Sequence, residues 1–133
     1  MQHYPIFADL KGRTVLLAGA GHVAERKAES LLQTGALVHV VAATLNPQFE
    51  AWQKAGQITW LGAEFQAAFV RKAFLVVAAT DDHDLNRHIF EAAEAEGKLC
   101  NTVDNQALCS YIVPAVINRS PIQVAVSSGG DSP

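Results

Sequence analysis

The sequence predicts an α/β protein with a Rossmann-like, doubly wound parallel sheet, and three observations carry this prediction. Short apolar runs alternate with amphipathic helical patterns along residues 14–103. The first run stops at the glycine turn Gly19-Ala20-Gly21, and a helical pattern starts directly after it. The run at residues 36–43 is apolar almost throughout, which is typical of a parallel strand covered on both faces. Short connections and right-handed crossovers then predict the strand order 3-2-1-4-5.

The strands are expected at five short apolar runs. Those runs cover residues 14–18, 36–43, 58–61, 74–79 and 98–103.

The helices are expected between these runs. An apolar stripe predicts the first over residues 22–34, with Gly35 after its end. Asn46 and Pro47 are suited to the cap and first position of a second, ending near Ala55. A helical turn is expected around residues 67–70. A longer helix over 83–96 would be capped by Asp81 or Asp82.

The pattern changes after residue 104. Residues 110–117 and 122–127 are strand-like, and a turn cluster at 118–121 lies between them without a helix. We therefore expect an antiparallel pair appended to the parallel sheet. Apolar strands at the chain end favour cover by a partner chain. This divides the chain into an α/β domain over 1–104 and a second region over 105–133, where a partner chain is expected.

Composition and charge narrow the function classes. The chain has 133 residues, half of them hydrophobic and 17% charged, as expected for one globular domain. A net charge of −3 favours neither nucleic acid nor an anionic membrane as partner. The first ten residues lack the basic start and apolar core of a signal peptide, so cytoplasm is the expected compartment.

Cysteine and histidine usage points to no disulfide framework and no metal site. The two cysteines are Cys100, expected as a small buried hydrophobe, and Cys109. His83 and His88 lie near a helix start, where a solvated face explains them better than metal binding does.

The glycine turn fits the dinucleotide-binding pattern, with alanine in the third small position. Gly19 permits the tight turn off the strand. Gly21 has no Cβ, so a pyrophosphate could approach its backbone. Ala24 lets the helix lie close to the strand. The helix start then offers unpaired N–H groups to the phosphates.

Ligands bind such sheets across the carboxyl ends of the strands. Four stretches are expected to converge there: Gly19–Val23, Ala43-Thr44, Thr80-Asp81 and Asn101–Asp104. The acid that usually follows the second strand is missing, which leaves Thr44 and backbone groups for the ribose. No Arg or Lys follows the strand either, so NAD is favoured over NADP.

Asp104 directly follows the fifth strand, three residues after Asn101. Its carboxylate could accept a proton as a substrate carbon loses hydride. It could equally take protons from a ligand that receives a metal. A turn aspartate bonding its own backbone explains the position as well, and these alternatives stay open.

Several stretches together resemble the N-terminal module of sirohaem synthase, the precorrin-2 dehydrogenase/sirohydrochlorin ferrochelatase family. The matching stretches, in the order of the family, are Tyr4–Phe7, Gly19–Lys27, Ala78–Asp82, Asn101–Asp104 and Arg119–Gly130.

The resemblance implies NAD-dependent oxidation of precorrin-2 to sirohydrochlorin, followed in many members by insertion of ferrous iron, a substrate, to give sirohaem. It implies that Asp104 serves both steps and that His22-Val23 and Ala43-Thr44 lie at the NAD. It also implies a homodimer, and a phosphorylated serine at the position of Ser128. Members of the family continue beyond Pro133 into dimerisation helices, which would hold part of the tetrapyrrole site.

Two other functions stay open beside this one. The chain could be a non-catalytic NAD-binding or sensing domain that acts through its C-terminal strands. It could also be a chelatase-only scaffold in which the nucleotide is secondary.

Overall fold

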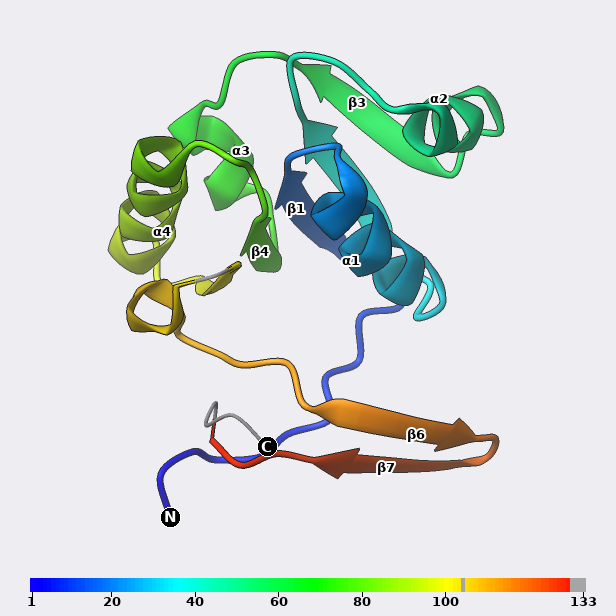
Figure 1. Ribbon diagram of the computed structural model, residues 1–133, viewed down its shortest axis with the longest axis vertical. Coiled ribbons are helices and arrows are strands. Elements are labelled where there is room, and N and C mark those ends of the chain that lie inside the picture. The colour runs from blue at the N-terminus through cyan, green and yellow to red at the C-terminus, as the bar shows by residue number, and fades with distance from the viewer. Residues whose placement is uncertain (104, 130–133) are drawn as a thin grey trace.

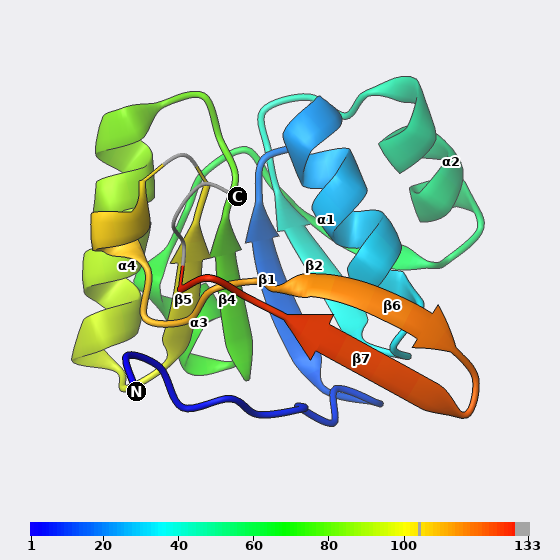
Figure 2. The same cartoon turned by 60° about the horizontal axis from the view of Figure 1, so that its bottom comes forward.

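The computed structural model describes residues 1–103 and 105–129 of the chain, and the statements below concern these residues. Its centre is a parallel five-stranded sheet in the order β3-β2-β1-β4-β5. Figure 2 shows β5, β4, β1 and β2 side by side. This confirms the predicted Rossmann-like sheet and its strand order. The strands are β1 (Thr14–Ala18), β2 (Leu37–Val41), β3 (Ile58–Gly62), β4 (Leu75–Ala78) and β5 (Leu99–Thr102).

Helices cover the two faces of this sheet, in the arrangement shown in Figure 1. They are α1 (His22–Leu32), α2 (Pro47–Lys54), α3 (Ala67–Arg71) and α4 (His83–Ala95), with a short 3₁₀ helix, η1 (Gln106–Leu108). The predicted caps are confirmed, because Asn46 accepts from the Phe49 amide and Asp82 accepts from the Leu85 amide. The first helix ends at Leu32, two residues early, since Thr34 bonds the Leu31 carbonyl and Gly35 has φ +79°.

Two hydrophobic cores lie on opposite faces of the sheet, because successive strand residues point to opposite sides. Val15 and Leu17 of β1 pack with the buried faces of α1 and α2. Leu16 and Ala18 pack with those of α3 and α4. Cys100 belongs to the second core and is fully buried, as predicted. β1 is thus the strand that joins both layers.

The C-terminal strands form the predicted antiparallel pair but differ from the prediction in three ways. They are β6 (Ala115–Arg119) and β7 (Ile122–Val126), and they form a separate two-stranded antiparallel sheet, not an extension of the parallel one. The expected strand over 110–117 starts late because Ser110 is held to β5: its hydroxyl accepts from the Cys100 amide and its own amide donates to the Cys100 carbonyl, both at 2.8 Å. The turn shrinks to Ser120-Pro121, so that Asn118 and Arg119 belong to β6.

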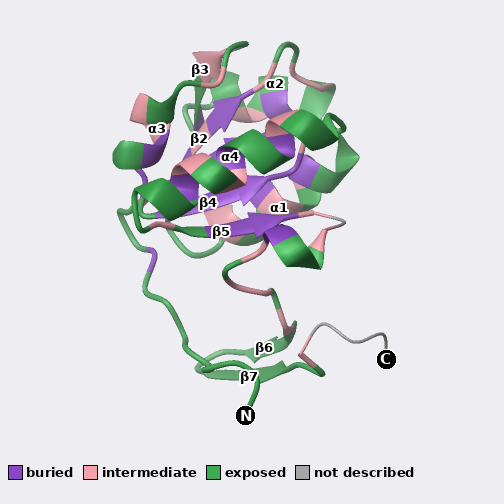
Figure 3. Cartoon of the chain, turned by 90° about the vertical axis from the view of Figure 1, so that its left-hand side faces the viewer, coloured by how far each residue is buried: buried purple, intermediate pink, exposed green. Residues whose placement is uncertain are grey.

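The hairpin of β6 and β7 is exposed along its whole length (Figure 3). It lies apart from the sheet in Figure 1 as well. Its side chains include the exposed Val116, Ile117, Ile122, Val124 and Val126. Among the described residues, no helix is long and apolar enough to cross a membrane.

We expect Gly19→Ala to destabilise the protein by roughly 2–5 kcal/mol. Gly19 has φ +113°, and a Cβ there would overlap the carbonyl oxygen of Ala79. The free energy of unfolding in urea measures the effect. Gly56→Ala is the matched control, because Gly56 also has positive φ (+74°) but nothing within 4 Å of an added Cβ. It should cost only about 1–2 kcal/mol. Equal losses in the two variants would contradict the close approach at Gly19.

Candidate functional site

The carboxyl edge of the sheet brings together the stretches that the sequence singled out. Backbone bonds continue past the strand ends: the Gly19 amide donates to Val41, the Ala79 amide to Ala18 and the Val103 amide to Ala78, at 2.8–3.0 Å. The segments that follow β1, β2, β4 and β5 therefore leave the sheet side by side. The predicted convergence is present in the backbone, except that Asp104 lies outside the described residues.

The turn after β1 combines one tightly packed glycine with one open glycine. Gly19 is buried against Ala79. Gly21 is exposed, with nothing within 4 Å of the position a Cβ would take, and it is the N-cap residue of α1. His22 and Val23 are exposed beside it, whereas Ala24 is fully buried against the sheet. An anionic group thus has open access to the backbone at Gly21.

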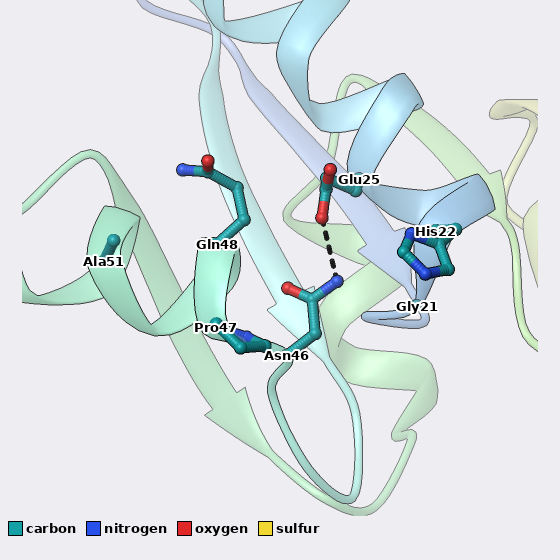
Figure 4. A pocket seen from close by; sticks show the side chains of 7 residues that line it. All are labelled: Gly21, His22, Glu25, Asn46, Pro47, Gln48 and Ala51. Carbon is teal, nitrogen blue, oxygen red and sulfur yellow. Dashed lines mark hydrogen bonds between the residues drawn. The ribbon is translucent and has the colours of Figure 1, made fainter.

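A hollow of about 560 Å³ lies between the starts of α1 and α2 (Figure 4). We call it the α1–α2 hollow. Glu25 and Asn46 face each other across it, and the Asn46 side-chain amide donates to a Glu25 carboxylate oxygen at 2.9 Å. The predicted contacts Ala43 and Thr44 are exposed in the segment between β2 and α2. The lining of the α1–α2 hollow comprises Gly21, His22, Glu25, Asn46, Pro47, Gln48 and Ala51.

Thr80, in the segment that follows β4, is fixed by a buried side chain of α4. The Asn86 carbonyl oxygen accepts from the Thr80 amide at 3.2 Å and from its hydroxyl at 2.6 Å. The Asn86 amide donates to the Thr80 carbonyl at 3.0 Å. Only 2% of Asn86 is exposed, so these bonds are shielded from water. Asn86 could not be recognised from the sequence, because a polar residue in a helix pattern does not reveal which loop it binds.

A second hollow, of about 470 Å³, lies beside the end of β5, and we call it the β5 hollow. Val23 and Lys27 of α1 line it, together with Asn101, Val103 and Asn105. The last two residues flank Asp104 in the sequence. The Asn101 amide donates to the Tyr111 carbonyl at 3.2 Å, which orients this side chain at the sheet edge.

Lys27 is half-buried at the β5 hollow, and burial lowers the pKa of its ammonium group. Cys109 lies at the same hollow, and its thiol is tied to the backbone by bonds with the Thr102 amide and carbonyl at 3.1 and 3.2 Å. Burial also raises the pKa of the Cys100 thiol to about 11, so that thiol stays neutral at physiological pH. The ammonium group is the feature of this hollow that would attract an anionic ligand.

The remaining predicted positions are spread over the surface. Ser128 is exposed on the segment after β7, next to Ser127, whose hydroxyl accepts from the Gly129 amide. His88 packs edge-on against Phe65, with ring centroids 5.5 Å apart. Across residues 1–103 and 105–129, no group of three or more His, Cys, Asp or Glu side chains could hold a metal ion.

The chain is similar to a family of NAD(P)-binding proteins and to siroheme synthases. The family model described as "Putative NAD(P)-binding" matches residues 6–115. The chain is 48% identical to a "Siroheme synthase" of Actinobacillus pleuropneumoniae serotype 3 (strain JL03), over 100% of this chain and 27% of that protein. It is 50% identical to the "Siroheme synthase" of Actinobacillus succinogenes, over 100% of this chain and 28% of that protein. The chain spans little more than a quarter of these curated relatives.

A solved structure titled "SirC, precorrin-2 dehydrogenase" superposes with a TM-score of 0.84 at 30% identity. The match covers 98% of this chain and 64% of that one. These findings confirm the resemblance to sirohaem synthases and the fold.

We expect Asn86→Ala to lower the free energy of unfolding by roughly 2–3 kcal/mol, because it leaves buried backbone groups of Thr80 without partners. If Thr80 contacts the nucleotide, the variant should also weaken NAD binding several-fold in calorimetric titration. The exposed Gln53 supplies the control, Gln53→Ala, which should change neither quantity. An unchanged free energy of unfolding in Asn86→Ala would refute the role of Asn86 in holding Thr80. Unchanged NAD affinity would show that Thr80 does not belong to the nucleotide site.

Lys27→Met should raise the melting temperature at pH 7 by roughly 1–3 °C, a modest gain because water still screens the ammonium group. The lowered pKa means that the folded protein binds this proton less tightly than the unfolded chain does. The cost of burying the charge is therefore complete below the lowered pKa and fades as pH rises toward the ordinary value of 10.5. The gain should shrink between pH 7 and pH 10.5. The exposed Lys54→Met is the control, and a gain independent of pH would contradict the assignment.

Proposed function

The chain belongs to the NAD(P)-binding family whose model it matches, and from that premise we propose that it catalyses the NAD-dependent dehydrogenation of precorrin-2 to sirohydrochlorin. One observation carries the proposal most directly. The β5 hollow extends from Val23, beside the glycine turn, to Val103 and Asn105, which flank Asp104. A substrate there would lie next to the nucleotide turn and to the two residues that flank Asp104 in the sequence. The similarity to a precorrin-2 dehydrogenase structure and to siroheme synthases supports the same reaction.

The nucleotide site in this proposal lies along the carboxyl edge of the sheet. Gly21 offers its open backbone and the start of α1 to the pyrophosphate. His22, Val23, Ala43 and Thr44 contact the bound NAD, as does Thr80, which Asn86 holds in place. Gly19 contributes by shaping the turn, since it is itself buried. NAD is preferred to NADP because no Lys or Arg follows β2 before α2.

The reaction removes a hydride and a proton from the reduced macrocycle. Bound NAD⁺ supplies the hydride acceptor. The Asp104 carboxylate accepts the proton that leaves the substrate, as a general base. Lys27, which lines the β5 hollow, binds a carboxylate of the substrate there, and this ion pair offsets the cost of burying the ammonium group.

Four further properties belong to the same proposal. Asp104 also takes protons from sirohydrochlorin when ferrous iron, a second substrate, is inserted to give sirohaem. The chain acts as a homodimer in the cytoplasm. It consists of an NAD-binding domain over 1–104 and a dimerisation region over 105–133. The exposed apolar hairpin of β6 and β7 supports an interface in that second region. Ser128 is exposed and accessible for phosphorylation.

Asp104→Asn in the full-length protein should lower the rate of sirohydrochlorin formation by about 10²–10⁴-fold, the usual contribution of a general base. NAD affinity should stay within about twofold. Absorbance of the macrocycle and of NADH measures turnover, and titration calorimetry measures binding. Asp84→Asn, at an exposed position of α4, is the control and should turn over normally.

The outcomes separate the alternatives. Full turnover by Asp104→Asn would rule out Asp104 as the general base but would leave the enzymatic function standing. NAD binding without turnover by the unmodified protein would favour a non-catalytic sensing domain. Iron insertion without dehydrogenation would favour a chelatase scaffold.

A further inference from the structure

The α1–α2 hollow contains a carboxylate that the reaction above does not use. Glu25 lies one helical turn after Gly21, so it sits beside the position proposed for the pyrophosphate. Its side chain is half-buried and points toward Asn46 in Figure 4. Glu25 is therefore in a position to meet the part of a dinucleotide that follows the phosphates.

The position of this carboxylate is fixed from outside its own helix. The Asn46 amide donates to one Glu25 oxygen at 2.9 Å, and the Asn46 carbonyl oxygen caps α2 by accepting from the Phe49 amide at 3.0 Å. Phe49 is fully buried, which anchors the start of α2. A carboxylate accepts several hydrogen bonds, so Glu25 can take another from a ligand in the hollow.

Among the described residues, the lining of the hollow also lacks a cationic side chain that could balance a 2′-phosphate. Among the described residues that line it, Glu25 carries the only formal charge, and His22 is the only other titratable side chain. No Lys or Arg of residues 1–103 and 105–129 lines it. A ribose hydroxyl would find an acceptor here, whereas a 2′-phosphate would meet a like charge without a cation to offset it.

We propose that Glu25, oriented by Asn46, is the acceptor for the adenosine ribose and the residue that discriminates against NADP. It replaces the acid that dinucleotide-binding folds usually place after the second strand. This inference rests on the proposed nucleotide site but not on the proposed reaction, because it concerns which dinucleotide binds. Glu25 acts by direct contact with the ligand, and Asn46 is a positioning residue.

Titration calorimetry with NAD and with NADP tests the proposal on the full-length protein. Glu25→Gln keeps the shape of the side chain and should reduce the NAD-over-NADP preference at least tenfold, mainly by tightening NADP binding. The preference of the unmodified protein should shrink between 0.05 and 0.5 M salt, approximate concentrations that span the screening range. That of Glu25→Gln should not. Glu29→Gln, one turn further along α1 and exposed, is the control and should behave as the unmodified protein.

Asn46→Ser supplies an independent variant. Serine is also a good helix cap, so α2 should form, but the donor to Glu25 is lost. We expect an intermediate loss of the preference. An unchanged ratio in folded Glu25→Gln overturns the inference, and if that variant does not fold, an unchanged ratio in Asn46→Ser does so. A changed ratio with no precorrin-2 turnover by the unmodified protein would overturn the proposed reaction and leave this inference standing.

Discussion

The close approach of Gly19 to Ala79 is the constraint on which the carboxyl edge of the sheet depends. β1 lies at the centre of the sheet, with β2 on one side and β4 on the other. Its turn must leave the sheet between the segments that follow those strands, and the carbonyl of Ala79 occupies the space that a Cβ of residue 19 would need. Only glycine satisfies both the contact and the positive φ without displacing the backbone. The open side of Gly21 and the start of α1 follow from this path.

The same constraint explains why Asn86 is buried although it is polar. The segment after β4 lies close to the turn at Gly19, where Ala79 is buried and Thr80 is partly buried. Asn86 provides both an acceptor and a donor to Thr80. Because one side chain hydrogen-bonds both backbone groups of Thr80, β4 can end at this edge without leaving them unpaired. The packing of Gly19 against Ala79 and the hydrogen bonds between Asn86 and Thr80 therefore hold adjacent residues of the same segment.

Sequence patterns predicted the sheet well and the contacts between loops poorly. Alternating apolar runs and helix caps are local, so the strand order and the caps at Asn46 and Asp82 could be anticipated. The late start of β6 could not, because it depends on Ser110 bonding Cys100, ten residues away. The bond between Glu25 and Asn46 spans 21 residues and two helices, and neither residue is unusual in its own stretch. Such pairs arise only when the sheet has set the distance between elements.

Helix geometry then accounts for the opposite charges on the two sides of α1. Glu25 and Lys27 are two positions apart, which at about 100° per residue places them on opposite flanks of the helix. Ala24 and Ala28 are fully buried against the sheet between them. The carboxylate therefore faces the α1–α2 hollow and the ammonium group faces the β5 hollow. A neutral ribose suits the α1–α2 hollow, and an anionic substrate suits the β5 hollow. One short helix thus contributes to the binding of both ligands at the edge of the sheet.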